Sequence, residues 1–177
     1  MKILVFDTET TGLLQPSIVP IEKQPHIIEF FGLSIDENGE ELGQFHRLYN
    51  PGYGLQPIIT QVTGLKDKDL KDKPKLDFDE AKALADYVQS HDEIVAHNLS
   101  FDFGMLNAEF KRNDVTIKWP RLTCTVEATE YMLGYRMKLS VLYDYLFQEK
   151  FEGAHRAEND VRALARCFLA LRKCGEI

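Results

Sequence analysis

The chain has 177 residues, of which 44% are apolar and 28% are charged, and its formal net charge is −7. These values are typical of a globular protein with a sizeable core, and we expect residues 1–177 to form a single domain. The acidic balance argues against a protein that coats nucleic acid. It does not exclude an enzyme that acts on one end of a strand, because bound metal ions supply positive charge locally.

Neither a membrane span nor a secretion signal is expected. No apolar run approaches the roughly 20 residues that cross a bilayer, and the N-terminus shows no signal peptide. The three cysteines, Cys124, Cys167 and Cys174, match no zinc or redox spacing, which favours reduced thiols. These features predict a cytoplasmic protein without a membrane partner.

The first expected element is a buried strand. Ile3 to Phe6 is a short, β-favouring apolar run that is followed by a Thr-rich turn with Gly12. Strand side chains alternate between two faces, so Asp7 and Glu9 share one face if the extended geometry persists. Two neighbouring carboxylates repel each other, and burial adds to the cost. A divalent cation relieves both penalties, so this strand end is a candidate metal site.

The rest of the chain is expected to alternate between strands and helices. The proline-rich segment 14–25 reads as a loop beside the site, which could be mobile, and Asn38-Gly39 is a hairpin signal. Strands are predicted over 26–35, within 42–49, over 93–96 and over 121–124, and helices over 57–62, from 78, from 99, over 125–134, from 140 and over 161–171. The predicted helix caps are Asp77, either Asn98 or Ser100, Thr125 and Ser140. This order predicts an α/β fold with helices packed on a sheet.

Two further aspartates border the apolar faces of predicted helices. Asp102 stands four residues before Leu106, and Asp160 stands four residues before Leu164. Either one could simply favour a helix N-terminus. An acid beside an inward face nevertheless needs a partner, and no Lys or Arg closely flanks that face. His155 precedes the last helix, where it could be a structural group or a proton acceptor with a pKa of about 6.5.

The joint pattern resembles the DEDDh branch of 3′–5′ exonucleases, the DnaQ-like group that includes the proofreading subunit of bacterial replicative DNA polymerase. The three motifs that carry the resemblance are VFDTETTGL at 5–13, IVAHNLSFD at 94–102 and AHRAEND at 154–160, and the segments HIIE at 26–29 and VTGL at 62–65 extend it. Many members have His where this chain has Thr63. The resemblance covers nearly the whole chain and implies a ribonuclease H-like fold, with a mixed central sheet flanked by helices.

The resemblance also implies a metal-dependent enzyme. Two divalent cations, Mg²⁺ or Mn²⁺, would be held by four carboxylates, those of Asp7, Glu9, Asp102 and Asp160. His155 would accept the proton of the attacking water. The enzyme would hydrolyse the terminal phosphodiester at a DNA 3′ end, preferably single-stranded, and release nucleoside 5′-monophosphates. Substrate contacts are expected from Glu9, Thr10, Leu13, Thr63, His97 and Phe101.

Several of these expectations have alternatives. Leu13 and Phe101 could stack against the last bases or pack in the core, and His97 could contact a phosphate or be a structural group. The same branch includes exoribonucleases that act on short RNA or RNA 3′ tails, although the motif TETTGL at 8–13 resembles the DNA-proofreading members more closely. A DNA polymerase could be a partner. A non-catalytic module that binds nucleic acid or a polymerase is a further alternative, yet all five catalytic positions are filled.

Overall fold

The computed structural model describes residues 1–150 and 157–177. Its strands are β1 (Lys2–Thr10), β2 (Ile27–Asp36), β3 (Glu41–Leu48), β4 (Glu93–Ala96) and β5 (Arg121–Cys124). Its helices are α1 (Pro57–Thr63), α2 (Asp67–Leu70), α3 (Phe78–Gln89), α4 (Leu99–Arg112), α5 (Thr125–Leu133), α6 (Leu139–Phe147) and α7 (Ala157–Lys173), with a short 3₁₀ turn η1 (Ile21–Lys23). None of the helices in these two ranges is long and apolar enough to span a bilayer.

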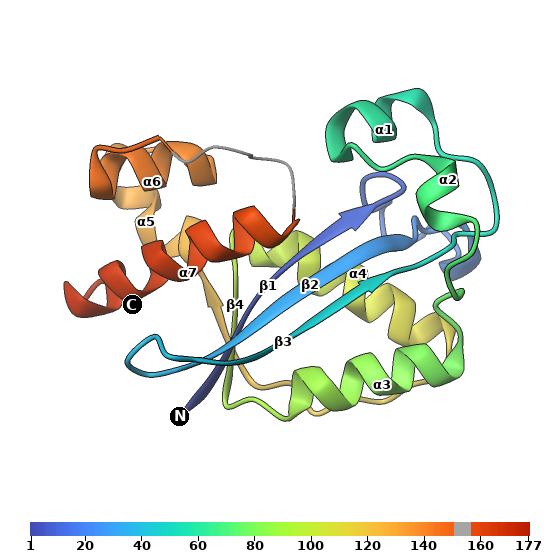
Figure 1. The fold of residues 1–177 in the computed structure, drawn as a ribbon, viewed down its shortest axis with the longest axis horizontal. Helices are drawn as coiled ribbons and strands as arrows, with labels where there is room; N and C mark the ends of the chain where they lie inside the picture. Colours follow the sequence, from blue (N-terminus) through green and yellow to red (C-terminus); the bar gives the residue numbers. More distant parts are fainter. Residues whose placement is uncertain (151–156) are drawn as a thin grey trace.

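The five strands form one mixed sheet in the order β3-β2-β1-β4-β5. β1, β2 and β3 pair in antiparallel fashion, whereas β4 is parallel to β1 and β5 is parallel to β4. The C-terminal ends of β1 and β4 therefore meet at the same edge of the sheet. Figure 1 shows α1 and α2 beyond that edge, where β1 finishes. In open sheets of this kind, ligands bind outside the carboxyl ends of the parallel strands.

Helices cover both faces of the sheet (Figure 1). Ile3 and Val5 of β1 pack in a cluster with α7, whereas Leu4 and Phe6 face a second cluster that includes residues of α3 and α4. This alternation follows from the two-residue period of a strand. Asp7 and Glu9 continue the odd-numbered series and so lie on the face that α7 covers. The predicted mixed sheet flanked by helices is confirmed.

Some boundaries differ from those predicted. β1 continues to Thr10 because its polar end still pairs with β2, with Glu9 opposite Glu29. The exposed segment 66–75 contains the short helix α2.

The predicted caps are correct in part. The Asp77 carboxylate accepts the Glu80 N–H (3.2 Å). Asn98 precedes α4, but its side chain makes no cap bond, because its backbone is left-handed with φ 70°. Thr125 and Ser140 were wrong as caps, since each helix begins from an extended residue upstream, Cys124 or Lys138.

Candidate active site

The first two motifs are joined by a buried aspartate. Asp102 lies in the first turn of α4, and only 3% of its surface is exposed. One of its carboxylate oxygens accepts both the main-chain N–H of Thr8 (3.1 Å) and the Thr8 hydroxyl (2.7 Å). Because Thr8 stands between Asp7 and Glu9, these two bonds hold Asp102 beside both strand carboxylates. Sequence reasoning placed Asp102 at the border of the apolar face, and the structure buries it there.

The carboxylates of the candidate site act on one another electrostatically. Burial, and then the charges of Asp102, Glu9 and Asp160, raise the pKa of Asp7 well above its ordinary value. Burial and the neighbouring acids, led by Glu29, raise the pKa of Glu9 to about 8. Burial also raises the pKa of Asp102 to about 7, against the opposing effect of its bonds from Thr8. The structure therefore brings all four predicted metal ligands into one region.

This donor set fits divalent cations chemically. Within the described ranges, no salt bridge joins Asp7, Glu9 or Asp102 to a cationic side chain. Nor do any three His, Cys, Asp or Glu side chains of the described residues form a ready-made metal-binding group. The fit thus depends on the chemistry of the donors, which are oxygen ligands whose charged forms are disfavoured without a cation. Their role as metal ligands stays a prediction.

Of the third motif, 154–160, the structure describes residues 157–160, which begin α7. Asp160 lies in the first turn of α7, is partly buried, and raises the pKa of both Asp7 and Glu9. His155, the predicted proton acceptor, falls outside the described residues.

Glu29 is a fifth acid beside the site, and it was absent from the predicted set. It lies opposite Glu9 in the register of β1 and β2, and its side chain is bonded to the His46 ring (2.7 Å). Its position could have been found from the sequence only by fixing the register of two strands.

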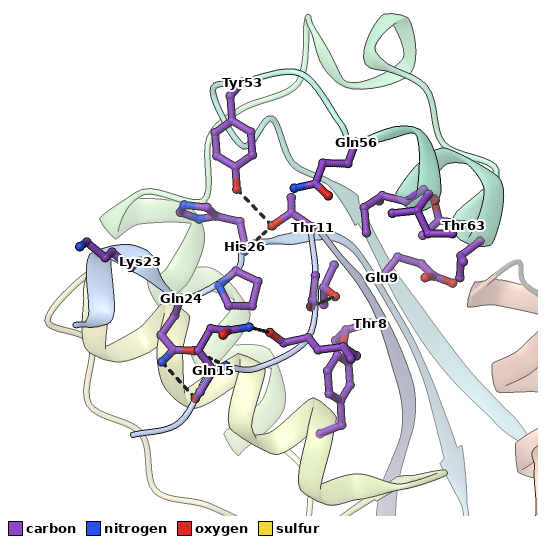
Figure 2. A pocket seen from close by; sticks show the side chains of 18 of the residues that line it. Thr8, Glu9, Thr11, Gln15, Lys23, Gln24, His26, Tyr53, Gln56 and Thr63 are labelled. Atoms are coloured by element: carbon purple, nitrogen blue, oxygen red, sulfur yellow. Dashed lines mark hydrogen bonds between the residues drawn. The ribbon is translucent and has the colours of Figure 1, made fainter. Parts of the chain in front are cut away.

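A cavity of 810 Å³ opens at the end of β1, and of the four predicted metal ligands it is Glu9 that lines it (Figure 2). Its walls come from the end of β1, the loop 11–26, α1 and the start of α4. They include five of the six predicted substrate contacts, namely Glu9, Thr10, Leu13, Thr63 and Phe101. This volume is in the range of small-molecule sites, which suits a nucleotide.

The predicted contacts differ in their local environment. Leu13 is 75% exposed and free to meet a ligand, whereas Phe101 both lines the cavity and packs against the core. Thr10 and Thr63 are buried, and their hydroxyls donate to the carbonyls of Gly12 (2.8 Å) and Ile59 (2.9 Å). The Thr10 and Thr63 hydroxyls are thus committed to the local fold.

His97 lies apart from the cavity lining. One ring nitrogen is bonded to the Thr125 hydroxyl (2.9 Å) and the other to the Met137 carbonyl (2.9 Å), and burial lowers the pKa of the ring. These two bonds connect the residue after β4 to the start of α5 and to the segment between α5 and α6. They support the structural interpretation of His97 rather than a phosphate contact.

The fold and this carboxylate site together are those of a DnaQ-like exonuclease, a nuclease of the hydrolase class. The model of the exonuclease family RNase_T matches residues 4–168, so the chain belongs to that family.

Two curated relatives are components of DNA polymerase III. The chain is 30% identical over 178 residues to the DNA polymerase III PolC-type of Streptococcus pyogenes serotype M2, with 98% of this chain and 11% of the relative covered. It is 34% identical over 109 residues to the DNA polymerase III subunit epsilon of Buchnera aphidicola, with 62% and 45% covered. The chain thus spans about a tenth of the first relative and under half of the second.

Two solved structures share the fold. Exonuclease X, in complex with 5′ overhanging duplex DNA, matches with a TM-score of 0.68 at 20% identity, over 98% of this chain and 93% of the other. Exonuclease I matches with a TM-score of 0.79 at 18% identity, over 97% and 41%. The predicted fold class is therefore confirmed.

Proposed function

We propose that the chain is a 3′–5′ exonuclease that hydrolyses the terminal phosphodiester of DNA, with a preference for single strands, and releases nucleoside 5′-monophosphates. The observation that carries this proposal is that the bonds between Thr8 and Asp102 hold Asp102 near Asp7 and Glu9, and that Glu9 lines a cavity of a size that suits one nucleotide. Relatives that belong to DNA polymerase III, and an exonuclease structure with DNA, support DNA as the substrate.

Each side chain has a role in this proposal. Two divalent cations, Mg²⁺ or Mn²⁺, would supply positive charge at the phosphate and activate water when bound. Asp7, Glu9, Asp102 and Asp160 would hold them, and Thr8 fixes the carboxylate of Asp102 through its two hydrogen bonds. His155 would accept the proton of the attacking water. Leu13 and Phe101 would contact the terminal nucleotide in the cavity.

A DNA polymerase is the proposed partner. The PolC-type relative contains a matching region within a much longer chain, and the epsilon relative carries the name of a polymerase subunit. We further propose that residues 1–177 act as one exonuclease domain.

The direct test is digestion of single-stranded DNA and matched RNA, each labelled at the 5′ end. We expect a ladder that shortens from the 3′ end on DNA with Mg²⁺ or Mn²⁺, no ladder with chelator, and none from Asp7→Ala. Asp79→Ala, an exposed acid at the start of α3, is the matched control and should retain the ladder. A ladder on RNA alone would move the substrate to RNA. No ladder on either, from folded protein, would contradict the proposal.

A second measurement addresses His155. If it is the proton acceptor, the activity of the wild type should fall on the acid side with a limb set by a His-like pKa, near 6.5. We expect His155→Ala to lose most activity and to lose that limb. A variant with the wild-type rate and an unchanged pH profile would exclude this role.

A further inference from the structure

We infer that Thr11 and His26 form a base-binding subsite, where both donate hydrogen bonds to acceptor atoms on the base of the terminal nucleotide. The inference rests on the proposed function, which places the scissile phosphate at the carboxylates. The proposed subsite lies at the end of the cavity beyond Glu9. Thr11 directly follows β1, and His26 directly precedes β2.

The position of this pair suits a base. Thr11 stands two residues beyond Glu9, about 7 Å along an extended chain. The Thr11 N–H donates to the His26 carbonyl (2.9 Å), and the His26 N–H donates to the Thr11 hydroxyl oxygen (2.9 Å), so the two residues form one block. Both line the cavity with Glu9. A nucleotide with its phosphate at the carboxylates would direct its base away from them, toward this block (Figure 2).

The Thr11 hydroxyl is left with only its hydrogen to offer. Its oxygen accepts the His26 N–H and also the Tyr53 hydroxyl (3.1 Å), as Figure 2 shows. A hydroxyl oxygen has two lone pairs, and these two bonds occupy both. Among the described residues, no acceptor takes the Thr11 hydrogen in return. The hydroxyl therefore presents a donor to whatever enters the cavity.

The His26 ring also presents a donor. Its Nδ1 lies 3.1 Å from Nη1 of Arg112 and 3.2 Å from Oε1 of Glu109. Arginine is always protonated, so a neutral His26 accepts from Arg112 at Nδ1 and carries its hydrogen on Nε2. If the ring is protonated, both nitrogens carry hydrogen and the charged ring is paired with the nearby Glu109 carboxylate, so Nε2 is again a donor. The remaining tautomer would point the Nδ1 hydrogen at the Arg112 N–H, which is unfavourable. Nε2 is thus a donor in both favourable states.

Arg112 can determine which ring nitrogen of His26 carries the hydrogen because hydrogen bonds hold the Arg112 side chain in place. Its Nη2 donates to three carbonyls of the loop before β2, those of Ile21 (3.1 Å), Gln24 (3.0 Å) and Pro25 (3.2 Å). The wholly buried Glu109 carboxylate pairs with it and accepts the Ile27 N–H (3.0 Å). The positioning residues Glu109 and Arg112 therefore anchor the cavity wall and set the hydrogen on His26.

A wall made of donors selects a ligand with acceptors. The carbonyl oxygens and ring nitrogens of bases meet this need, and a site built for such bonds rejects an analogue that lacks them. A phosphate would also accept, for example at a 3′-phosphorylated end. We favour the base because the same cavity is also lined by apolar side chains such as Ile59 and Val62, against which a planar ring can pack.

Kinetics on two DNA ends tests the base contact. One single strand ends in thymidine, and a matched strand ends in a tetrahydrofuran residue that has no base. Each lost bond is worth about tenfold in kcat/KM. We expect His26→Phe and Thr11→Val to lose about tenfold on the thymidine end and less than about twofold on the baseless end. His26→Gln, which keeps an N–H donor, should recover part of the loss.

The controls and contrary outcomes are distinct. Tyr145→Phe, an exposed hydroxyl on α6, should leave both rates unchanged. An equal loss on both ends would show that the pair contacts sugar or phosphate or merely supports the loop, and would overturn the inference. So would no loss on either end. A loss confined to a 3′-phosphorylated strand would assign the donors to a phosphate instead.

A measurement without catalysis separates this inference from the proposed function. Long-range ¹H–¹⁵N NMR of the imidazole rings reports which nitrogen of His26 carries hydrogen, with assignment by His26→Gln. We expect Nε2–H, and a shift of that signal on addition of thymidine 5′-monophosphate but not of deoxyribose 5-phosphate. Hydrogen on Nδ1 alone would overturn the inference even if nuclease activity is confirmed. An inactive protein that gives the expected spectra would contradict only the proposed function.

Discussion

The protein buries carboxylates in two different ways. Glu93 and Glu109 are wholly buried, and each pairs with an arginine: Glu93 with Arg172 (2.7 Å) and Glu109 with Arg112. Asp7, Glu9 and Asp102 lie in the same fold without such a partner among the described residues, and the pKa of each is raised. The first group holds distant segments together, whereas the second has no such cationic side chain to neutralise it and is left to protons or to a cation from solution.

This difference separates structural acids from chemical ones. Removing one partner of a buried ion pair is destabilising because the charge of the other partner is then left buried and unpaired. A cluster of unpaired acids does the reverse, because it costs stability until protons or cations neutralise it. A variant of an acid paired with arginine should therefore mainly lower stability, whereas a variant of an unpaired acid should mainly lower activity.

The largest effect is expected from Asp7→Asn. Loss of one ligand should remove several kcal/mol of charge stabilisation in the transition state, which corresponds to a fall of about a thousandfold in kcat/KM. The melting temperature should stay equal or rise, because one repelling charge is gone. Exonuclease rates and thermal unfolding of the same samples test both parts. An active variant, or one that fails to fold, would remove Asp7 from the chemical group.

Glu109→Ala should show the opposite pattern. It leaves the mostly buried Arg112 side chain without its carboxylate partner and should lower the free energy of unfolding by about 3–5 kcal/mol, as measured in urea. The double variant Glu109→Leu with Arg112→Leu should lose less, because no charge is then left unpaired. If Glu109→Ala loses under about 1 kcal/mol, the distinction between the two groups of acids does not hold.

Mg²⁺ and pH should act on the unpaired group together. The folded-state pKa values of Glu9 (about 8) and Asp102 (about 7) exceed those of unfolded acids, so the metal-free fold retains protons that the unfolded chain releases. Their contribution to stability is full below about pH 4 and is lost as pH rises through 7 to 8. Mg²⁺ should therefore raise the melting temperature by several degrees at pH 8.5 and by less at pH 6. Equal shifts at both values would contradict this linkage.

The smallest effect is expected from Glu29→Gln. After burial, Glu29 is the leading cause of the raised pKa of Glu9, so its neutralisation should let Glu9 ionise more readily. The pH at which Mg²⁺ begins to stabilise the fold should fall by less than about one unit. His46→Gln, which keeps the Glu29 carboxylate, is the matched control. A shift to higher pH would contradict the electrostatic argument.

Sequence reasoning found what depends on local patterns. The strands at 93–96 and 121–124 were predicted with their observed bounds, because each is a short segment beside clear breaks in the chain. Motif spacing identified Asp7, Glu9 and Asp102, and the structure brings them together. The apolar alternation of β1 was enough to predict which face Asp7 and Glu9 share.

The features that sequence reasoning could not find depend on contacts between residues that are distant in the chain. Arg112 bonds carbonyls that lie 87 to 91 residues earlier in the chain, and no local pattern specifies such a pairing. Glu29 became part of the site only once the register of β1 and β2 was known. The left-handed backbone of Asn98 was also missed, because asparagine is equally common as an ordinary cap.

The bonds between Thr8 and Asp102 have a consequence for synthesis. They join residues 94 positions apart, and Asp160, which acts on Asp7 from α7, comes still later. Chain elongation proceeds at about 5–20 residues per second, so a nascent chain spends several seconds with the first strand made and its partners absent. An unfinished copy on the ribosome therefore holds only part of the carboxylate cluster, so the proposed active site is completed only late in synthesis.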